Sequence, residues 1–555
     1  MSIRAPLPVL DPAPPAIEAP RAGTRPDGAL EEYATEGRLL PAFHVWTLGC
    51  QMNASDSEEM AGALLAAGCS EARGLEDADL IIINTCSIRE TAEQKVIGRM
   101  GLLRQLKAAN PALRVVLTGC SVRADNERIL QRRYPAVDLF LRPDEEPELT
   151  ARLGLVGPTT PGELSGPGFQ RVGRSVAAVA DRLLATRAAA VNAGHVARAT
   201  GARAWLPIIY GCDKTCTYCI VPFARGPERS RPFDDIVAEA RALGASGYRE
   251  ITLLGQNVNS WGHDLPPDAR FAGVGSQRQL GHPQVRDSRP DIAALLRAID
   301  AIRDEHGRPV VPRLRFVTSH PWDLTERLVA TMADCPSVCE HLHLPVQSGS
   351  DEVLRRMGRQ YSVAAYRELV ARLRAAVPGI SLTTDVIVGF CGEREAHFEA
   401  TLDLLREVRF DQVFAAAYSP RPGTPAAQLA DDVPAAEKRR RLNVLLDLQE
   451  GIGRELNEAW LGRRSEVLVE EVRPRRRHQH DADGEKRQDG EGSQDGGRPD
   501  APVARGPRLA GRNREHKLVH FDGPAELVGQ FVDVIIERAG PYALVGRAAG
   551  EGHHG

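Results

Sequence analysis

Three cysteines in one short stretch carry the clearest chemical signal of this sequence. Cys212, Cys216 and Cys219 follow the apolar residues Ile208 and Ile209 with the spacing C-x3-C-x2-C. Three soft thiolates on one loop can bind three irons of a cubane cluster, and the fourth iron then receives no ligand from this loop. Because an open iron can bind a substrate or a cofactor, the spacing favours catalysis over electron storage.

Two other uses of these thiols stay open at this point. A zinc site needs four ligands, which usually come in two pairs, and the nearest further cysteines are Cys335 and Cys339. A redox pair at Cys216 and Cys219 leaves Cys212 without a role. The three-ligand iron–sulfur cluster accounts for all three thiols and is the preferred hypothesis.

Three more cysteines each come just after a predicted strand. The strand candidates are residues 44–48, 80–83 and 114–117, and they lead into Cys50, Cys86 and Cys120. A polar stretch that can open a helix follows each cysteine, and the spacings of 86 − 50 = 36 and 120 − 86 = 34 residues are about one βα unit each. The pattern predicts a small parallel α/β sheet, in which the loops at the carboxyl ends of the strands converge.

This convergence would bring Cys50, Cys86 and Cys120 together and predicts a second metal cluster. The wider spacing makes the signal weaker than that of the loop, because buried, inert cysteine is common. The remaining cysteines lack such a pattern, and we expect them to be packing residues: Cys69, Cys335, Cys339 and Cys391.

Between Trp205 and Tyr418 strands and amphipathic helices alternate again, which predicts an open, partial (βα)6 barrel. The strand candidates are residues 206–210, 251–254, 314–317, 341–344, 382–388 and 413–418, with helices such as 234–243, 324–332 and 398–408 between them. Active-site residues of such barrels come from the carboxyl ends of the strands. On this ground the cofactor-binding candidates are Gln256, Asn257, Ser319 and Gln347. Residues 265–290 are polar and rich in Gly and Pro, as is typical of a surface insertion.

The C-terminal region predicts a small all-β barrel, with strand candidates at 466–472, 517–521 and 531–537. Its basic stretch opposes several cations to the single acidic Glu515: Arg508, Arg512, Arg514 and Lys517. On a small barrel such an edge suits phosphate contacts and base stacking, so we expect RNA binding there. The alternative is a solvated charged face.

The length of 555 residues predicts about three domains. The expected division is a disordered tail (1–40), an α/β domain (41–156), a connector (157–203), the partial barrel (204–455) and the β-barrel (456–549), interrupted by a disordered insertion (474–505). No apolar run reaches the ~18 residues of a membrane helix, so we expect a cytoplasmic protein without a membrane partner. The net charge of −4 means that any nucleic-acid surface must be a local patch.

Taken together, these features resemble a known family. The C-x3-C-x2-C loop at the start of a partial barrel resembles the radical S-adenosylmethionine enzymes, and the additional cysteines in front of it are similar to those of the methylthiotransferases. Four stretches are similar to the branch that acts on N6-dimethylallyladenosine in bacterial tRNA: Leu254-Gly-Gln-Asn-Val-Asn259, Ser319-His-Pro321, Leu344-Pro-Val-Gln-Ser-Gly-Ser350 and Gly511-Arg-Asn-Arg-Glu515. The resemblance covers roughly Phe43 to Val545, without the tail and the insertions.

The resemblance implies two [4Fe-4S] clusters and S-adenosyl-L-methionine. The cluster at Cys212, Cys216 and Cys219 would bind S-adenosylmethionine at its open iron and cleave it to a 5′-deoxyadenosyl radical, which takes hydrogen from C2 of the adenine. The cluster at the other triplet would carry the sulfur that is methylated and joined to C2. This C2–H bond is unactivated, so acid–base groups alone could not functionalise it, and the cofactors carry the hard chemistry.

The resemblance also implies the partners. The small β-barrel resembles a TRAM domain, which would grip the anticodon stem-loop of tRNA. We expect a monomer that receives electrons from a donor such as flavodoxin or ferredoxin. The expected activity is that of a tRNA methylthiotransferase acting at C2 of N6-dimethylallyladenosine next to the anticodon.

Two alternatives and one departure accompany this expectation. The same chemistry could act on threonylcarbamoyl-adenosine in tRNA or on an aspartate of a ribosomal protein, although the stretches Gln256–Asn259 and Arg512–Glu515 favour dimethylallyladenosine. A chain without catalysis could be an iron–sulfur RNA-binding or redox-sensing protein. Cys391 stands where the family more often has Pro, which we expect to be a tolerated loop change.

Overall fold

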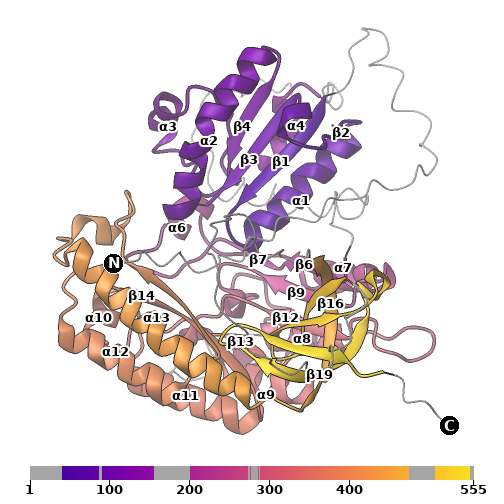
Figure 1. Ribbon diagram of the computed structural model, residues 1–555, viewed down its shortest axis with the longest axis vertical. Coiled ribbons are helices and arrows are strands. Elements are labelled where there is room, and N and C mark those ends of the chain that lie inside the picture. The colour runs from indigo at the N-terminus through magenta and orange to yellow at the C-terminus, as the bar shows by residue number, and fades with distance from the viewer. Residues whose placement is uncertain are drawn as a thin grey trace, which may run out of the picture.

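The computed structural model describes residues 41–86, 90–155, 201–272, 275–276, 285–286, 288–473 and 507–550. Our predictions of a disordered tail (1–40) and a disordered insertion (474–505) lie outside the described residues, as does nearly all of the connector (157–203). Three units follow one another along the described chain (Figure 1).

The first unit is a five-stranded parallel sheet covered by helices on both faces. Its strands lie in the order β2 (Ser70–Glu71), β1 (Ala42–Leu48), β3 (Leu80–Thr85), β4 (Arg114–Thr118) and β5 (Leu139–Phe140). Helices α1 (Gln51–Ala66) and α4 (Leu149–Arg152) cover one face, and α2 (Glu90–Ala109) and α3 (Glu127–Arg133) cover the other.

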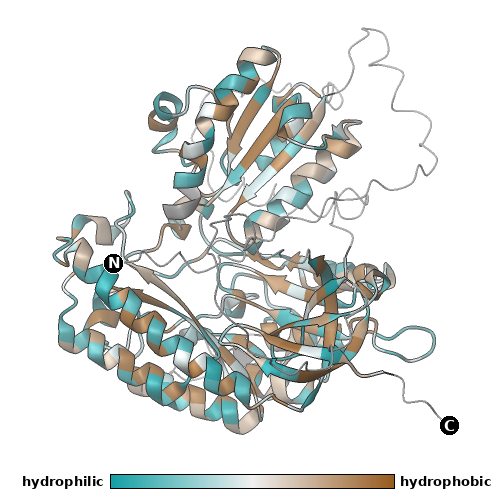
Figure 2. Cartoon of the chain, in the orientation of Figure 1, coloured by the Kyte–Doolittle hydropathy of each residue, from teal (hydrophilic) through white to brown (hydrophobic). Residues whose placement is uncertain are grey.

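Strand β3 shows why this sheet forms. Its side chains alternate between the two faces, so that Ile81 and Ile83 pack on the α2 side while Leu80 and Ile82 pack on the α1 side. Both faces are covered, which explains the continuous apolar run in the sequence. Figure 2 shows the same arrangement as apolar strands between amphipathic helices. The three predicted strands are confirmed; the two-residue strands β2 and β5 were not predicted.

The second unit is the predicted partial barrel of six parallel strands. The strands are β6 (Arg203–Pro207), β9 (Glu250–Leu254), β12 (Arg313–Phe316), β13 (His341–His343), β14 (Ser381–Val388) and β15 (Gln412–Ala417). They form two three-stranded sheets that meet where Leu314 pairs with Val338. The connecting helices are α7 (Phe233–Ala245), α8 (Ile292–Asp300), α9 (Glu326–Asp334), α10 (Asp351–Arg356), α11 (Val363–Ala376) and α12 (Glu395–Val408).

Two segments of this unit differ from the prediction in detail. The first predicted strand divides after Pro207, which has no amide proton to donate, and its second part, β7 (Ile209–Tyr210), pairs antiparallel with β8 (Arg229–Ser230). Within the predicted insertion, β10 (Gly275–Ser276) and β11 (Val285–Arg286) form an antiparallel pair.

The third unit is a closed five-stranded barrel that follows the long helix α13 (Ala435–Glu458). Its strands lie in the order β16 (Arg464–Arg473), β17 (Arg508–Arg512), β18 (Leu518–Asp522), β20 (Leu544–Ala548) and β19 (Phe531–Ala539). The predicted barrel is confirmed, but β17 and β20 were not predicted as strands. Among the described helices, none combines the length and apolar character needed to cross a bilayer.

Candidate functional site

The loop triplet, which we define as Cys212, Cys216 and Cys219, lies between β7 and α6 (Val221–Arg225). Gly211 precedes it with a φ of +73°, and a Cβ at this position would collide with the carbonyl oxygen of Pro227. The backbone then closes on itself, because Cys212 N donates to Gly226 O at 3.1 Å. A glycine-dependent turn therefore begins the short loop that carries the three thiols.

Burial makes the thiols of Cys212 and Cys219 hard to ionise. It raises the pKa of Cys212, and burial together with the charges of its neighbours raises the pKa of Cys219 to about 12. The buried Arg359 donates from Nη1 toward Cys216 Sγ at 3.6 Å. Such thiols keep their protons until a metal displaces them, and their soft sulfur atoms suit iron.

The sheet triplet, which we define as Cys50, Cys86 and Cys120, sits at the carboxyl ends of β1, β3 and β4. The register pairs Leu48 with Thr85, and Asn84 with Thr118, so each strand ends at the same edge of the sheet. Cys86 and Cys120 are buried and Cys50 is half-buried. The predicted convergence of the three strand ends is confirmed; that these cysteines bind a cluster stays a prediction.

A buried polar network supports the sheet triplet. Asn53 Oδ1 accepts from Cys50 N at 3.2 Å, and Asn53 Nδ2 donates to Asn84 Oδ1 at 2.7 Å. Gly119, just before Cys120, has a φ of +90°, and a Cβ there would collide with Thr85 O. The network joins the loops after β1 and β3, and the glycine allows the loop after β4 to approach them.

The two triplets lie on the two sides of the contact between the first two units, where Arg225 of α6 donates to Cys120 Sγ at 3.1 Å. Burial is the main cause of the raised pKa of both Cys120 and Cys219. The charge of Cys50 adds to the shift of Cys120, and the charge of Cys120 adds to that of Cys219. Within the described part of the chain, no three His, Cys, Asp or Glu side chains converge as ligands of a single metal ion. Three thiolates that each bind a different iron of a cubane do not need such convergence.

The four cofactor-binding candidates at the strand ends differ in which of their polar atoms lack a hydrogen-bond partner. Oε1 of Gln256 and Oγ of Ser319 are buried and have no hydrogen-bond partner in the described structure. Asn257 is engaged at both ends of its amide, because Nδ2 donates to Asp323 Oδ2 at 2.7 Å and Oδ1 accepts from His320 N at 3.2 Å. Gln347 has a φ of +70° and its backbone pairs with β14.

Sequence reasoning missed three charged residues beside the loop triplet. Lys214 Nζ lies 2.8 Å from Asp323 Oδ2, whose side chain is fully buried. Burial raises the pKa of Glu228 to about 7 although Ser260 and Lys214 oppose the shift. Lys214 could have been found from its place inside the C-x3-C spacing, whereas no local pattern marked Glu228.

A cavity of about 310 Å³ is lined by chain neighbours of both triplets, although none of the six cysteines lines it. Thr85, Ser121 and Ile220, which line it, are the direct chain neighbours of Cys86, Cys120 and Cys219. Arg123 and Arg421 add positive charge to its wall. Its volume is at the lower end of the range of small-molecule sites.

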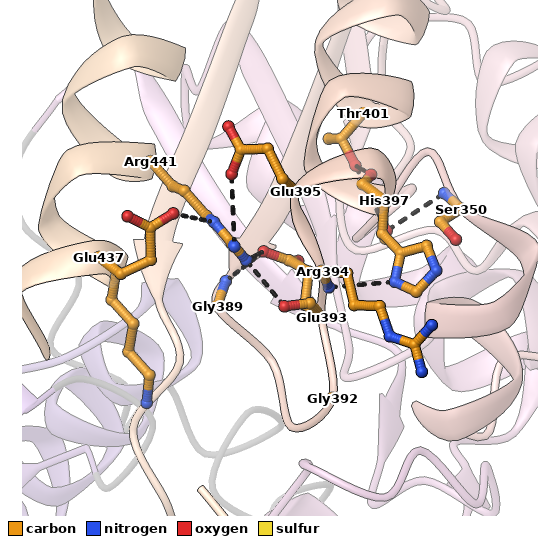
Figure 3. Close-up of polar contacts among 12 residues, drawn as sticks. Ser350, Gly389, Gly392, Glu393, Arg394, Glu395, His397, Thr401, Glu437 and Arg441 are labelled. Atoms are coloured by element: carbon orange, nitrogen blue, oxygen red, sulfur yellow. Dashed lines mark hydrogen bonds and ion pairs between the residues drawn. The ribbon is translucent and has the colours of Figure 1, made fainter. Parts of the chain in front are cut away.

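Cys391 lies in the loop after β14, whose shape depends on an ion-pair network (Figure 3). Glu393 Oε1 accepts from Gly389 N and from Arg441 Nη1, both at 2.7 Å. The Cys391 side chain is buried in an apolar cluster with Phe390. Burial is also found for the other three cysteines that were predicted to be packing residues: Cys69, Cys335 and Cys339.

The predicted RNA-binding cations lie largely between the C-terminal barrel and the partial barrel. Arg514 pairs with Glu340 of the partial barrel at 2.7 Å, and Lys517 Nζ lies 2.5 Å from Asp411 Oδ1 of the same unit. Arg512 pairs with Glu470 of its own barrel at 2.8 Å. Arg313 and Arg315 of β12 donate to the carbonyls of Arg512 and Asn513. Arg508 lies at the start of β17, away from these pairs. RNA contact by these four residues stays a prediction.

The chain matches two family models and is similar over most of its length to proteins of one name. Residues 206–405 match the radical SAM superfamily, and residues 42–142 match a family described as Uncharacterized protein family UPF0004. A tRNA-2-methylthio-N(6)-dimethylallyladenosine synthase from Carboxydothermus hydrogenoformans is 40% identical over 507 residues, which are 91% of this chain and 98% of the relative. The synthase of the same name from Geobacillus kaustophilus is 40% identical over 523 residues, which are 94% of this chain and 84% of the relative.

Solved structures are much less similar. A radical S-adenosylmethionine methyltransferase from Kitasatospora setae superposes with a TM-score of 0.41 at 15% identity, covering 80% of this chain and 79% of that chain. A likeness this slight carries no argument about the site.

Proposed function

We propose that this chain, which belongs to the radical S-adenosylmethionine methylthiotransferase family that includes the tRNA-2-methylthio-N6-dimethylallyladenosine synthases, adds a methylthio group to C2 of N6-dimethylallyladenosine next to the anticodon of tRNA. The observation that carries the proposal is the proximity of the two cysteine triplets, since Arg225 of α6, the helix that follows Cys219, donates to Cys120 Sγ at 3.1 Å. A reaction that joins sulfur to an unactivated carbon needs a source of each reactive partner within reach of one substrate.

Two [4Fe-4S] clusters fit the residues present. The loop triplet would hold one cluster with an open iron, and the sheet triplet would hold the other. When bound, the clusters and S-adenosylmethionine supply the electron transfer, radical and sulfur chemistry that the C2–H bond requires. The donor set supports this assignment, because each triplet offers three soft thiols.

The surrounding residues would bind and orient the small molecule. Oε1 of Gln256 is a buried acceptor without a partner and suits an ammonium group, whereas the Oγ of Ser319 can donate to a carboxylate. Lys214 and Asp323 form a fixed ion pair at the same edge of the barrel. Asn257 and Gln347 would act through the backbone and side chains they hold in place.

The partners we propose are the anticodon stem-loop of tRNA and a one-electron donor such as flavodoxin or ferredoxin, with a monomer acting in the cytoplasm. Among the four predicted RNA-binding cations, Arg508 is the first candidate for RNA contact. Arg512, Arg514 and Lys517 are already paired with carboxylates and would have to exchange these partners for phosphates.

Mass spectrometry of tRNA nucleosides tests the substrate. In a strain lacking this gene we expect methylthio-dimethylallyladenosine to disappear and its precursor without sulfur to accumulate. The wild-type gene should restore it and a Cys212→Ala copy should not. An unchanged nucleoside profile would exclude tRNA as the substrate, and loss of a methylthio-threonylcarbamoyl nucleoside instead would assign the alternative substrate.

The formation of 5′-deoxyadenosine separates an enzyme from a binding or sensing protein. The reconstituted protein, reduced with dithionite in the presence of S-adenosylmethionine, should release 5′-deoxyadenosine. If none forms while the iron content shows intact clusters, the enzyme assignment is wrong.

A further inference from the structure

Arg225 connects the two cysteine triplets directly. It is the last residue of α6, the short helix that follows Cys219. Its Nε donates a hydrogen bond to Cys120 Sγ at 3.1 Å, and its Nη2 donates to Asp56 Oδ2 at 2.6 Å. A side chain of the partial barrel therefore reaches a cysteine and a carboxylate of the N-terminal sheet unit.

The contact between Arg225, Asp56 and Cys120 is buried. The side chains of Arg225 and Asp56 are each only 5% exposed. A guanidinium at such depth needs a counter-charge, which Asp56 supplies. The planar fork presents Nε and Nη2 along one edge, so the same orientation that satisfies Asp56 also directs an N–H group at the sulfur of Cys120.

A donor directed at a ligand sulfur affects an iron–sulfur cluster in a known direction. Hydrogen bonds and positive charge stabilise the reduced form, which carries one more negative charge, and make the reduction potential less negative. Removing the donor should therefore make the cluster harder to reduce.

We propose that Arg225 is a positioning residue that sets the reduction potential of the cluster held by Cys50, Cys86 and Cys120, through its hydrogen bond to the sulfur of Cys120. The proposal rests on the proposed function, because it requires that cluster. Since α6 begins two residues after Cys219, the same side chain also holds the two triplets at a fixed separation.

The chain offers a matched control. Arg123 is also a buried guanidinium between the same two units: its Nη2 donates to Pro422 O at 3.3 Å and its Nε donates to Asp125 at 2.9 Å. None of its hydrogen bonds goes to a cysteine. Arg123→Gln thus removes a comparable contact between the units without changing a donor to sulfur.

The experiment uses the full chain with Cys212, Cys216 and Cys219 replaced by Ala, so that a single cluster remains. This parent and its Arg225→Gln, Arg225→Lys and Arg123→Gln derivatives are reconstituted with iron and sulfide. Their reduction potentials are measured by electron paramagnetic resonance during titration with dithionite, which supplies one electron to the cluster.

We expect Arg225→Gln to shift the potential to a more negative value and Arg225→Lys to give a smaller shift in the same direction, because it keeps the charge. Arg123→Gln removes a charge but no donor to sulfur, so its shift should also be smaller than that of Arg225→Gln. An Arg225→Gln variant that is loaded with iron and has the parent's potential would overturn the proposal. If Arg225→Gln does not retain iron, Arg225→Lys is judged by the same criterion.

Other outcomes are also decisive. Loss of iron from both Arg225 variants would mean that the residue acts in folding the site, and the tuning role would be wrong. An equal shift in Arg123→Gln would assign the effect to the contact between the units and overturn the role of the sulfur bond. A parent that binds no cluster would instead refute the second cluster of the proposed function, and the tuning role with it.

Discussion

One cysteine triplet lies on a single loop between β7 and α6, whereas the other is collected from the ends of three strands. The loop triplet lies on one loop, which starts at the tight turn of Gly211 and is fixed to the partial barrel by hydrogen bonds of Thr217 with Met357 and Ala426. The sheet triplet needs the register of β1, β3 and β4 and the polar network around Asn53. The loop site therefore depends on one loop and on the part of the partial barrel that holds it, while the sheet site depends on the register of three strands.

The largest effect should come from deleting each triplet separately. Replacing Cys212, Cys216 and Cys219 by Ala should abolish 5′-deoxyadenosine formation. Replacing Cys50, Cys86 and Cys120 by Ala should leave 5′-deoxyadenosine but abolish methylthio transfer. Each variant should retain about four of about eight irons per chain. Iron assays and product analysis check this, and an iron content near four in the wild type would remove one of the two sites.

A core substitution in the sheet should separate the two sites without touching a cysteine. Ile82 is fully buried in β3, and Ile82→Ala should lower the free energy of unfolding by about 2–5 kcal/mol. We expect the iron content to fall by about half while 5′-deoxyadenosine formation persists. Leu253→Ala in β9 is the matched control, because Leu253 is equally buried in the partial barrel. Loss of both clusters in Ile82→Ala would contradict the independence of the two sites.

The same contrast explains how much of the site could be predicted from sequence. The loop triplet was recognisable because its spacing is local. The sheet triplet was recognisable because the same order, a strand followed by a cysteine, recurs at intervals of one βα unit. In both cases a short-range pattern carries the information, and the regular geometry of parallel strands does the rest.

Long-range pairing was not predictable in this way. Arg225 meets Cys120 and Asp56 only because two units dock, and no spacing in the sequence shows that contact. Arg514 looked like an exposed RNA-binding cation, yet its partner Glu340 lies 174 residues away in the chain. A run of basic residues in the sequence indicates local positive charge, but it does not indicate which distant carboxylates pair with these residues in the folded protein.

Strand β17 was missed for a related reason. It pairs antiparallel with β16, but residues 474–507 separate the two strands, so the sequence has no short turn that would indicate a hairpin. Its sequence, Arg508 to Arg512, has charged ends and small residues at Ala510 and Gly511. The apolar alternation that identified the other strands is weak there.

Two glycines allow a smaller and more symmetric test of the comparison. Gly119 and Gly211 both have positive φ, directly precede a cysteine, and leave no space for a Cβ. Replacing either by Ala should cost about 1–3 kcal/mol of local strain. Gly119→Ala should reduce only the iron bound by the sheet triplet, and Gly211→Ala only that bound by the loop triplet and hence 5′-deoxyadenosine formation. Gly98→Ala, where a Cβ meets no neighbour, serves as the control.

The smallest expected effect concerns one carboxyl near each triplet. Burial and the charge of Asp56 raise the pKa of Glu146 to about 8, and burial raises that of Glu228 to about 7. Above the ordinary pKa of 4.5 the unfolded chain loses the proton that the folded chain keeps, so stability falls as the pH rises from about 4.5 to each folded value.

Thermal unfolding of the cluster-free protein at pH 5.5 and pH 8.5 measures this difference. Glu146→Gln cannot ionise and should reduce the fall in Tm between the two pH values by about 2–4 °C. Glu228→Gln should reduce it less, because its folded pKa is nearer the ordinary value and its window closes near pH 7. A Glu146→Gln variant with the parent's pH dependence would show that this carboxyl is ionised in the folded protein. Glu146 accepts a hydrogen bond from Thr118 at 2.6 Å, and Thr118 ends the strand that leads to Cys120. The larger change in the pH dependence of Tm is therefore expected for the carboxyl beside the sheet triplet.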